Sequence, residues 1–200
     1  MLASISPLGE RARGNRWGLT AGVYIGASVT AAALLGGLLG LGGHVAHGGS
    51  GPSLTSLMAV ALVAGGAGVL DLVAPGRLLS PLRQVDEDWL SRYRGWVYGL
   101  GFGTQLGLGL VTIVTTATTY AWMLAAVLSS SVALGAGIGA VFGLARGAPL
   151  VMMAGVETPA QLRRVLERLS AWACPGRVLA GTASVVVGAG TVAVAFGGYR

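Results

Sequence analysis

A run of hydroxyl side chains inside the second long apolar stretch could form a binding position for a substrate or an ion. Threonine hydroxyls can hydrogen-bond to the carbonyl four residues earlier and bend a helix. A bent helix exposes backbone groups, which proteins tolerate at membrane depth only inside protein or around a cavity. The alternative is that these hydroxyls are satisfied on packed helices or form a plain turn. The predicted substrate-binding position comprises Gln105, Thr112, Thr115, Thr116, Thr119 and Tyr120.

Arg146 is a further candidate for this site, because an ionisable residue at membrane depth marks a functional site by default. It could bind an anion or pair with Asp71, which lies near the inner end of the second predicted helix. The alternative is an arginine that extends to the cytoplasmic interface along its apolar stem. Gly147 and Pro149, which follow Arg146 closely, favour that alternative.

Metal, redox and soluble-type catalytic chemistry have little support. His44 and His47 could reach one metal ion, but no third ligand is near in sequence, so they are weak candidates and we expect no metal. Cys174 is the single cysteine and cannot form an intramolecular disulfide. The Gly-x-Gly patterns follow no predicted strand, which argues against dinucleotide binding. We therefore expect no catalytic residues, no cofactor and no enzymatic activity.

The elements that must position these residues are membrane helices. Three stretches contain no charged residue: Trp17–Leu70 with 54 residues, Gly95–Ala145 with 51, and Val178–Tyr199 with 22. A helix needs about 20 apolar residues to cross a bilayer core ~30 Å thick. Hydrophobic residues make up 54% of the chain and charged residues 10%. The sequence predicts an all-α, polytopic transmembrane helical bundle with about five crossings.

The pattern divides the chain into a cytoplasmic polar arm at residues 1–16 and a single transmembrane domain at 17–200. Pro7 and Gly9 disfavour a helix at the start of the arm. The turn in the second long stretch could fall at Thr115–Tyr120 or at Ser129–Ser131, and we favour the latter. A helix over 96–128 would be ~50 Å long, so it must tilt, break or re-enter. The predicted spanning helices cover 17–43, 54–74, 96–128, 132–155 and 177–197.

Residues 158–173 are predicted to form an amphipathic helix that lies in the plane of the membrane interface. Thr158, Pro159 and Gln161 resemble a capping box with proline at the first helical position. The run Cys174–Gly176 is predicted to end this helix before the last crossing. One face is apolar and the other carries charge, formed respectively by Leu162, Val165, Leu166, Leu169 and Trp172, and by Arg163, Arg164, Glu167 and Arg168.

The distribution of positive charge predicts the orientation. All 13 basic residues are arginine, and the net charge is +6. If the N-terminus is cytoplasmic, only Arg200 lies outside, which the positive-inside rule favours. The basic charge therefore reflects an N-in, C-out protein of a bacterial plasma membrane rather than a nucleic-acid binder. The arginines placed inside are Arg11, Arg13, Arg16, Arg77, Arg83, Arg92, Arg94, Arg163, Arg164, Arg168 and Arg177.

Many of the 35 glycines stand four residues apart, so they share a helix face. Glycine on such a face lets two helix backbones approach closely. The rows predict tight packing within the monomer or between copies, or alternatively surfaces that slide in a transporter. The three rows are Gly18, Gly22 and Gly26; Gly99, Gly103 and Gly107; and Gly135, Gly139, Gly143 and Gly147.

The order of elements over residues 95–198 resembles the second half of the membrane domain shared by thiol–disulfide interchange and cytochrome c biogenesis transmembrane proteins. The resemblance rests on a long helix with a polar break, then a glycine-rich helix ending in Phe142–Leu150 (FGLARGAPL), a basic amphipathic stretch and a last glycine-rich helix. The family carries a Pro-Cys pair where this chain has Val114–Tyr120 (VTTATTY), and its first helix with a partner cysteine is expected to have no counterpart here. The resemblance implies an inverted-repeat, alternating-access bundle without a two-thiol electron relay.

A second similarity involves Arg83–Trp96 (RQVDEDWLSRYRGW) and Gly101–Gly107 (GFGTQLG), which look like segments of uncharacterised actinobacterial integral membrane proteins. That similarity implies no activity.

These observations predict a transporter-like multi-pass membrane protein with a polar site at a threonine-rich helix break. The alternative is a non-catalytic membrane subunit, or an assembly or redox accessory protein, that docks other helices through its glycine rows. Its partners would be the lipid bilayer and either further copies of the chain or another membrane subunit. The sequence names no substrate or coupling ion.

Overall fold

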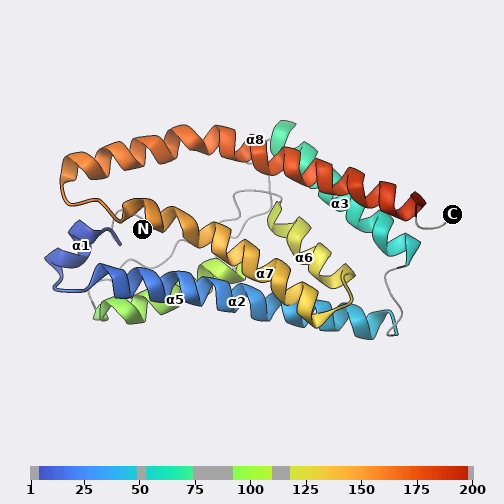
Figure 1. Ribbon diagram of the computed structural model, residues 1–200, viewed down its shortest axis with the longest axis horizontal. Helices are drawn as coiled ribbons and strands as arrows, with labels where there is room; N and C mark the ends of the chain where they lie inside the picture. Colours follow the sequence, from blue (N-terminus) through green and yellow to red (C-terminus); the bar gives the residue numbers. More distant parts are fainter. Residues whose placement is uncertain (1–4, 49–52, 74–91, 110–117, 198–200) are drawn as a thin grey trace. The chain divides into compact units, whose positions relative to one another are not determined.

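The computed structural model describes residues 5–48, 53–73, 92–109 and 118–197, and within these ranges all regular structure is helical, which confirms the all-α prediction (Figure 1). The chain divides into two compact units. Unit 1 contains Met1–Ala32, Pro81–Ile113 and Ala140–Ala173, and unit 2 contains Ala33–Ser80, Val114–Gly139 and Cys174–Arg200. The helices are α1 (Pro7–Ala12), α2 (Trp17–Ala46), α3 (Leu54–Val73), α5 (Gly95–Leu108), α6 (Thr118–Leu128), α7 (Val132–Gly147), the 3₁₀ helix η1 (Ala148–Met153) and α8 (Pro159–Gly197).

Three helical segments of the described residues are long and apolar enough to cross a membrane: Trp17–Ala46, Val132–Met153 and Cys174–Ala193. Two shorter apolar segments, Leu54–Leu70 and Thr119–Leu128, accompany them. Their length and composition support a membrane protein, because a crossing needs about 20 apolar residues. The count of five crossings and the N-in orientation stay predictions.

Helix α1 differs from the prediction of an arm without a helix at its start. Ser6 is the N-cap, and its Oγ accepts a hydrogen bond from the Gly9 backbone N–H at 3.2 Å. Pro7 occupies the first turn, where its missing N–H costs no hydrogen bond. These two features offset the low helix propensity of Gly9 and hold the short helix together.

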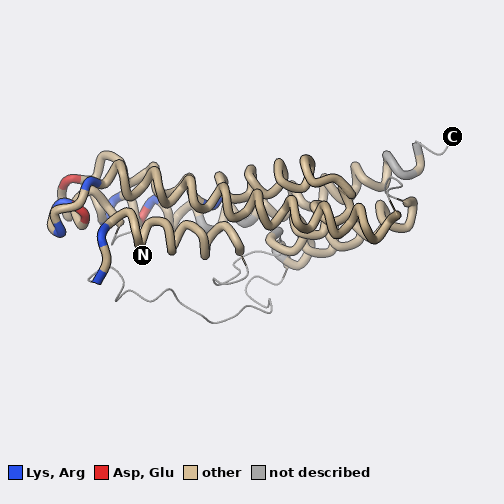
Figure 2. Tube along the Cα trace, turned by 90° about the horizontal axis from the view of Figure 1, so that it is seen from below, with Lys and Arg blue, Asp and Glu red and all other residues tan. Residues whose placement is uncertain are grey.

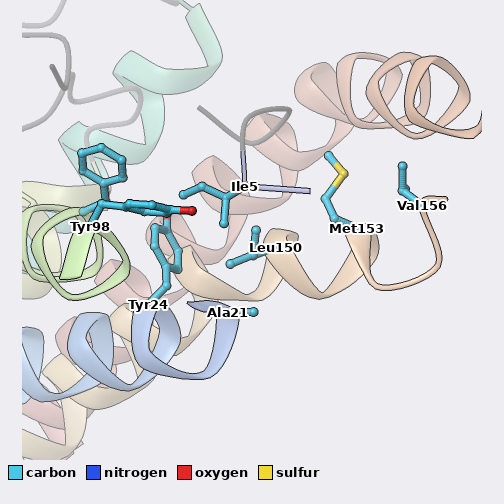
Figure 3. Close-up of a cluster of buried hydrophobic side chains, with 8 residues drawn as sticks. Ile5, Ala21, Tyr24, Tyr98, Leu150, Met153 and Val156 are labelled. Atoms are coloured by element: carbon cyan, nitrogen blue, oxygen red, sulfur yellow. The ribbon is translucent and has the colours of Figure 1, made fainter. Parts of the chain in front are cut away.

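The core of unit 1 joins α2, α5 and η1 with Ile5, just before α1, around buried aromatic and aliphatic side chains (Figure 3). The apolar face of the first half of α8 packs against this core through Leu162, Val165, Leu166 and Leu169. The core of unit 1 therefore covers much of the apolar face that the sequence predicts for residues 158–173. The buried members of the core are Ile5, Ala21, Tyr24, Tyr98, Phe102, Leu150, Met153 and Val156.

Glycines allow α5 and α7 to approach the first half of α2 in unit 1. A methyl group on Gly103 would collide with the carbonyl oxygen of Tyr24, and one on Gly107 with that of Ser28. On α7, a methyl group on Gly143 would meet the same Ser28 carbonyl oxygen. The Ser28 hydroxyl donates a hydrogen bond to the Gly143 carbonyl at 3.0 Å. Two of the predicted glycine rows thus include residues that pack helices within the chain.

In unit 2, glycines allow close packing in two further helix pairs. Gly36 of α2 and Gly135 of α7 face each other so closely that a methyl group on either would meet the carbonyl oxygen of the other. Helices α3 and α8 lie side by side, with Gly68 against Gly181 (Figure 1). Helix α6 packs on α3, and a small alanine core there contains Ala64, Ala67 and Ala121.

The predicted helix over 96–128 is not continuous. Helix α5 ends at Leu108, and its C-cap Gly109 has a φ of 68°, in the left-handed region that glycine adopts without strain. Residues 110–117 lie outside the described residues, and α6 then ends at Leu128. The turn before α7 falls on Ser129–Ser131, with Ser130 at φ 47°. This is the position that we favour from the sequence.

Helix α8 runs without interruption through Cys174, Pro175 and Gly176, where the sequence predicts an end. Proline lacks an N–H and its ring crowds the preceding turn, so it normally ends or kinks a helix. Membrane helices tolerate proline better, since neighbouring groups satisfy the freed carbonyl. The prediction was wrong because it applied the rule for helices in water.

The charged residues are distributed unequally between the units. Most of those described belong to unit 1, where they lie in and after α1, before α5 and along the start of α8 (Figure 2). This concentration agrees with the distribution from which we predict the orientation.

Candidate functional site

A fully buried carboxylate lies at the start of the first long helix. Glu10 of α1 has an exposed fraction of 0%. An isolated charge in such a position would be very costly, so its partners decide what the site can do. They come from the loop after α1, and from α2 and α5.

Three side chains donate hydrogen bonds to the Glu10 carboxylate. Arg13 donates from Nη2 to Oε1 at 2.7 Å, and Thr20 donates from Oγ1 to Oε2 at 2.9 Å. The Tyr98 hydroxyl donates to Oε1, and the Asn15 amide donates to the Tyr98 hydroxyl at 3.4 Å. We call Glu10, Arg13, Asn15, Thr20 and Tyr98 the Glu10 cluster.

Arg13 compensates the buried charge. Its guanidinium forms the ion pair with Glu10 and lies 5.8 Å from the centre of the Tyr98 ring. Partial burial lowers the pKa of Arg13, but its hydrogen bond to Glu10 and its other interactions with Tyr98 and Glu10 raise that pKa by more. Arg13 therefore stays cationic at any physiological pH.

Gly95 leaves the space that the cluster occupies. A methyl group on this first residue of α5 would lie 2.9 Å from Glu10 Oε2 and closer still to Thr20 Oγ1. The cluster therefore depends on close approach of α5 to α1 and α2. Both carboxylate oxygens of Glu10 already accept hydrogen bonds from this chain. The Glu10 cluster therefore has a structural role, in which its hydrogen bonds hold α1, α2 and α5 together.

The predicted threonine site is only partly described. Thr112, Thr115 and Thr116 lie outside the described residues. Gln105 is half-buried on α5 in unit 1. Thr119 is 2% exposed and Tyr120 37% exposed at the start of α6 in unit 2. The described members thus belong to different units, and the binding position stays a prediction.

Arg146 lies in the last turn of α7 and is half-buried. Its guanidinium lies 5.6 Å from the centre of the Phe142 ring. The side chain of Asp71 lies outside the described part of the chain, so the predicted pair is not tested.

His47 is held in a hydrogen-bonded cluster of unit 2 rather than beside His44. Its Nδ1 donates to the Gly43 carbonyl at 2.7 Å, and its Nε2 lies 2.7 Å from Ser56 Oγ. His44 is exposed. Within the described ranges, no three residues among His, Cys, Asp and Glu are grouped as metal ligands would be.

Sequence reasoning missed Glu10. Ser6 followed by Pro7 is a helix-start signal and could have revealed α1. The burial of Glu10 had no local signal, because its partners Thr20 and Tyr98 stand 10 and 88 residues away.

No family model and no solved structure match the chain. Two curated relatives do. Methylamine utilization protein MauF of Paracoccus denitrificans is 40% identical over 127 residues, which cover 62% of this chain and 44% of the relative. The protein of the same name from Paracoccus versutus is 36% identical over 136 residues, covering 67% and 47%. The chain therefore spans about half the length of the curated relatives it matches.

Proposed function

We propose that this chain is a non-catalytic membrane accessory protein that serves methylamine utilization by docking helices of a partner membrane protein. The observation that carries the proposal is the 40% identity to MauF of Paracoccus denitrificans over 127 residues. It agrees with the accessory interpretation of the sequence and gives no support to the transporter interpretation.

An exposed row of glycines on α2 supports such docking. Gly18, Gly22 and Gly26 are exposed on α2, and a methyl group on any of them would meet no atom of the described chain within 4 Å. The other two glycine rows contain residues that pack helices of this chain together. A row of small residues on a membrane helix allows a second helix to approach closely. The partner would therefore contact the first half of α2.

Growth of the encoding organism tests the function. Deletion of the gene should abolish growth on methylamine and leave growth on ammonium and succinate unchanged. The wild-type gene should restore growth on methylamine. Normal growth of the deletion strain on methylamine would contradict the proposal.

Matched substitutions test the docking surface. Gly22→Leu places a large side chain in the exposed row and should fail to restore growth. Gly137→Leu is the control, because Gly137 is also exposed with nothing within 4 Å of an added methyl group, but it lies on α7 outside the row. Both variants should accumulate in membranes like the wild type. Restoration by Gly22→Leu would exclude this row as the docking surface.

A further inference from the structure

A groove in unit 1 has basic and apolar sides. Its volume is about 210 Å³, and it lies between the segment that ends η1 and the first turns of α8. Met152, Val156 and Val165 form its apolar lining, and Gln161, Arg164 and Arg168 form its polar lining. The polar residues lie three and four apart, so they share one face of α8.

The polar lining offers donors and no carboxylate. Among the described residues, Arg164 and Arg168 have no ion-pair partner, whereas Glu157, the nearest acid before α8, pairs with Arg11 at 2.9 Å. Gln161 Oε1 accepts hydrogen bonds from the backbone N–H groups of Glu157 and Thr158 at 2.9 and 3.0 Å. Its amide N–H₂ group therefore remains as the donor that Gln161 can offer. A groove of this kind suits an anion with several oxygens, such as a phosphate.

The apolar lining favours an amphiphile over a bare anion. Met152 is 49% exposed beside the buried Val156, so an acyl chain can cover apolar surface next to the two guanidinium groups. The groove also adjoins the apolar spanning segment Val132–Met153, which contains Met152. On the predicted orientation it faces the cytoplasmic leaflet, which is rich in anionic lipids.

We propose that this groove binds the phosphate headgroup of an anionic phospholipid, held by Arg164 and Arg168. The inference does not depend on the proposed role in methylamine utilization. A bound lipid would fix the first half of α8 against the bilayer surface. Arg163, on the same helix, does not line the groove and plays no part.

The test measures binding of dioctanoyl-phosphatidylglycerol to the purified full chain in detergent by native mass spectrometry. Arg164→Gln/Arg168→Gln should weaken binding by about 30-fold, since each basic residue near an anionic surface contributes roughly a factor of five. Arg16→Gln/Arg163→Gln removes the same charge from exposed positions outside the groove and should leave binding unchanged. Thermal unfolding of both variants should match that of the wild type, because these arginines are exposed.

Three results would overturn the proposal. The first is wild-type affinity in Arg164→Gln/Arg168→Gln. The second is an equal loss in the control variant, which would show a general charge effect. The third is binding of dioctanoyl-phosphatidylcholine or inorganic phosphate as tight as that of dioctanoyl-phosphatidylglycerol. Equal binding of phosphatidylcholine would show that the groove does not require an anionic lipid. Equal binding of inorganic phosphate would assign the groove to a free anion.

Discussion

The hydroxyl of Tyr98 on α5 donates a hydrogen bond to the carboxylate of Glu10 on α1, and both side chains are fully buried. This bond joins segments 88 residues apart. It ties the N-terminal helix to a helix from the middle of the chain and makes residues before the first long helix part of the core of unit 1.

Tyr98→Phe should destabilise the protein by about 1–3 kcal/mol, because it removes one donor from a buried carboxylate and leaves the ring in place. Thermal unfolding in detergent measures the change. Tyr93→Phe is the control, since Tyr93 is 50% exposed, and it should cost less stability than Tyr98→Phe. Equal stability of Tyr98→Phe and wild type would show that the bond contributes nothing.

Glu10→Gln should cost about 1–3 kcal/mol, because an amide cannot replace both carboxylate oxygens as acceptors for Arg13, Thr20 and Tyr98. Glu157→Gln removes an exposed ion pair with Arg11 and should cost less than about 1 kcal/mol. Urea unfolding of the two variants compares a buried with an exposed acid. If Glu157→Gln lost more unfolding free energy than Glu10→Gln, the stabilising role of the Glu10 cluster would be contradicted.

Gly103→Ala should destabilise by about 1–3 kcal/mol, since the added methyl group meets the Tyr24 carbonyl oxygen and forces α5 away from α2. Gly22→Ala meets nothing within 4 Å and should be neutral or stabilising by up to about 1 kcal/mol. Melting temperatures of the isolated chain provide the comparison. The helix packing described for unit 1 fails if the two variants have the same melting temperature.

His47→Ala should lower stability by about 1–2 kcal/mol, because it breaks the hydrogen bonds to Gly43 and Ser56. His44→Ala changes an exposed side chain and should have no effect. Zinc titration of the wild type adds a second readout. Zinc-dependent stabilisation that both substitutions abolish would restore the metal hypothesis.

Apolar periodicity and charge placement predict much of the fold. Helices α2, α3 and α7 begin at Trp17, Leu54 and Val132, the residues at which the sequence predicts helices to begin. Charge-free length is a reliable signal there, because the cost of a charge in hydrocarbon acts at every position. Two of the three glycine rows likewise contain residues at which helices of the chain pack closely.

The remaining features depend on contacts between distant residues. Glu10 is buried only because Thr20 and Tyr98 reach it, and neither spacing is a recognised pattern. Helix α8 continues through Pro175, which the local rule for proline does not predict. The threonine site was inferred from polarity alone, and three of its residues fall outside the described ranges.

Membrane insertion is the claim on which every other inference depends. The most direct test extracts membranes of the expressing cell with alkaline sodium carbonate and follows the full chain in pellet and supernatant. We predict that the protein stays in the pellet, because Trp17–Ala46, Val132–Met153 and Cys174–Ala193 are long and apolar enough to span the bilayer. Recovery of folded protein in the carbonate supernatant would contradict the account.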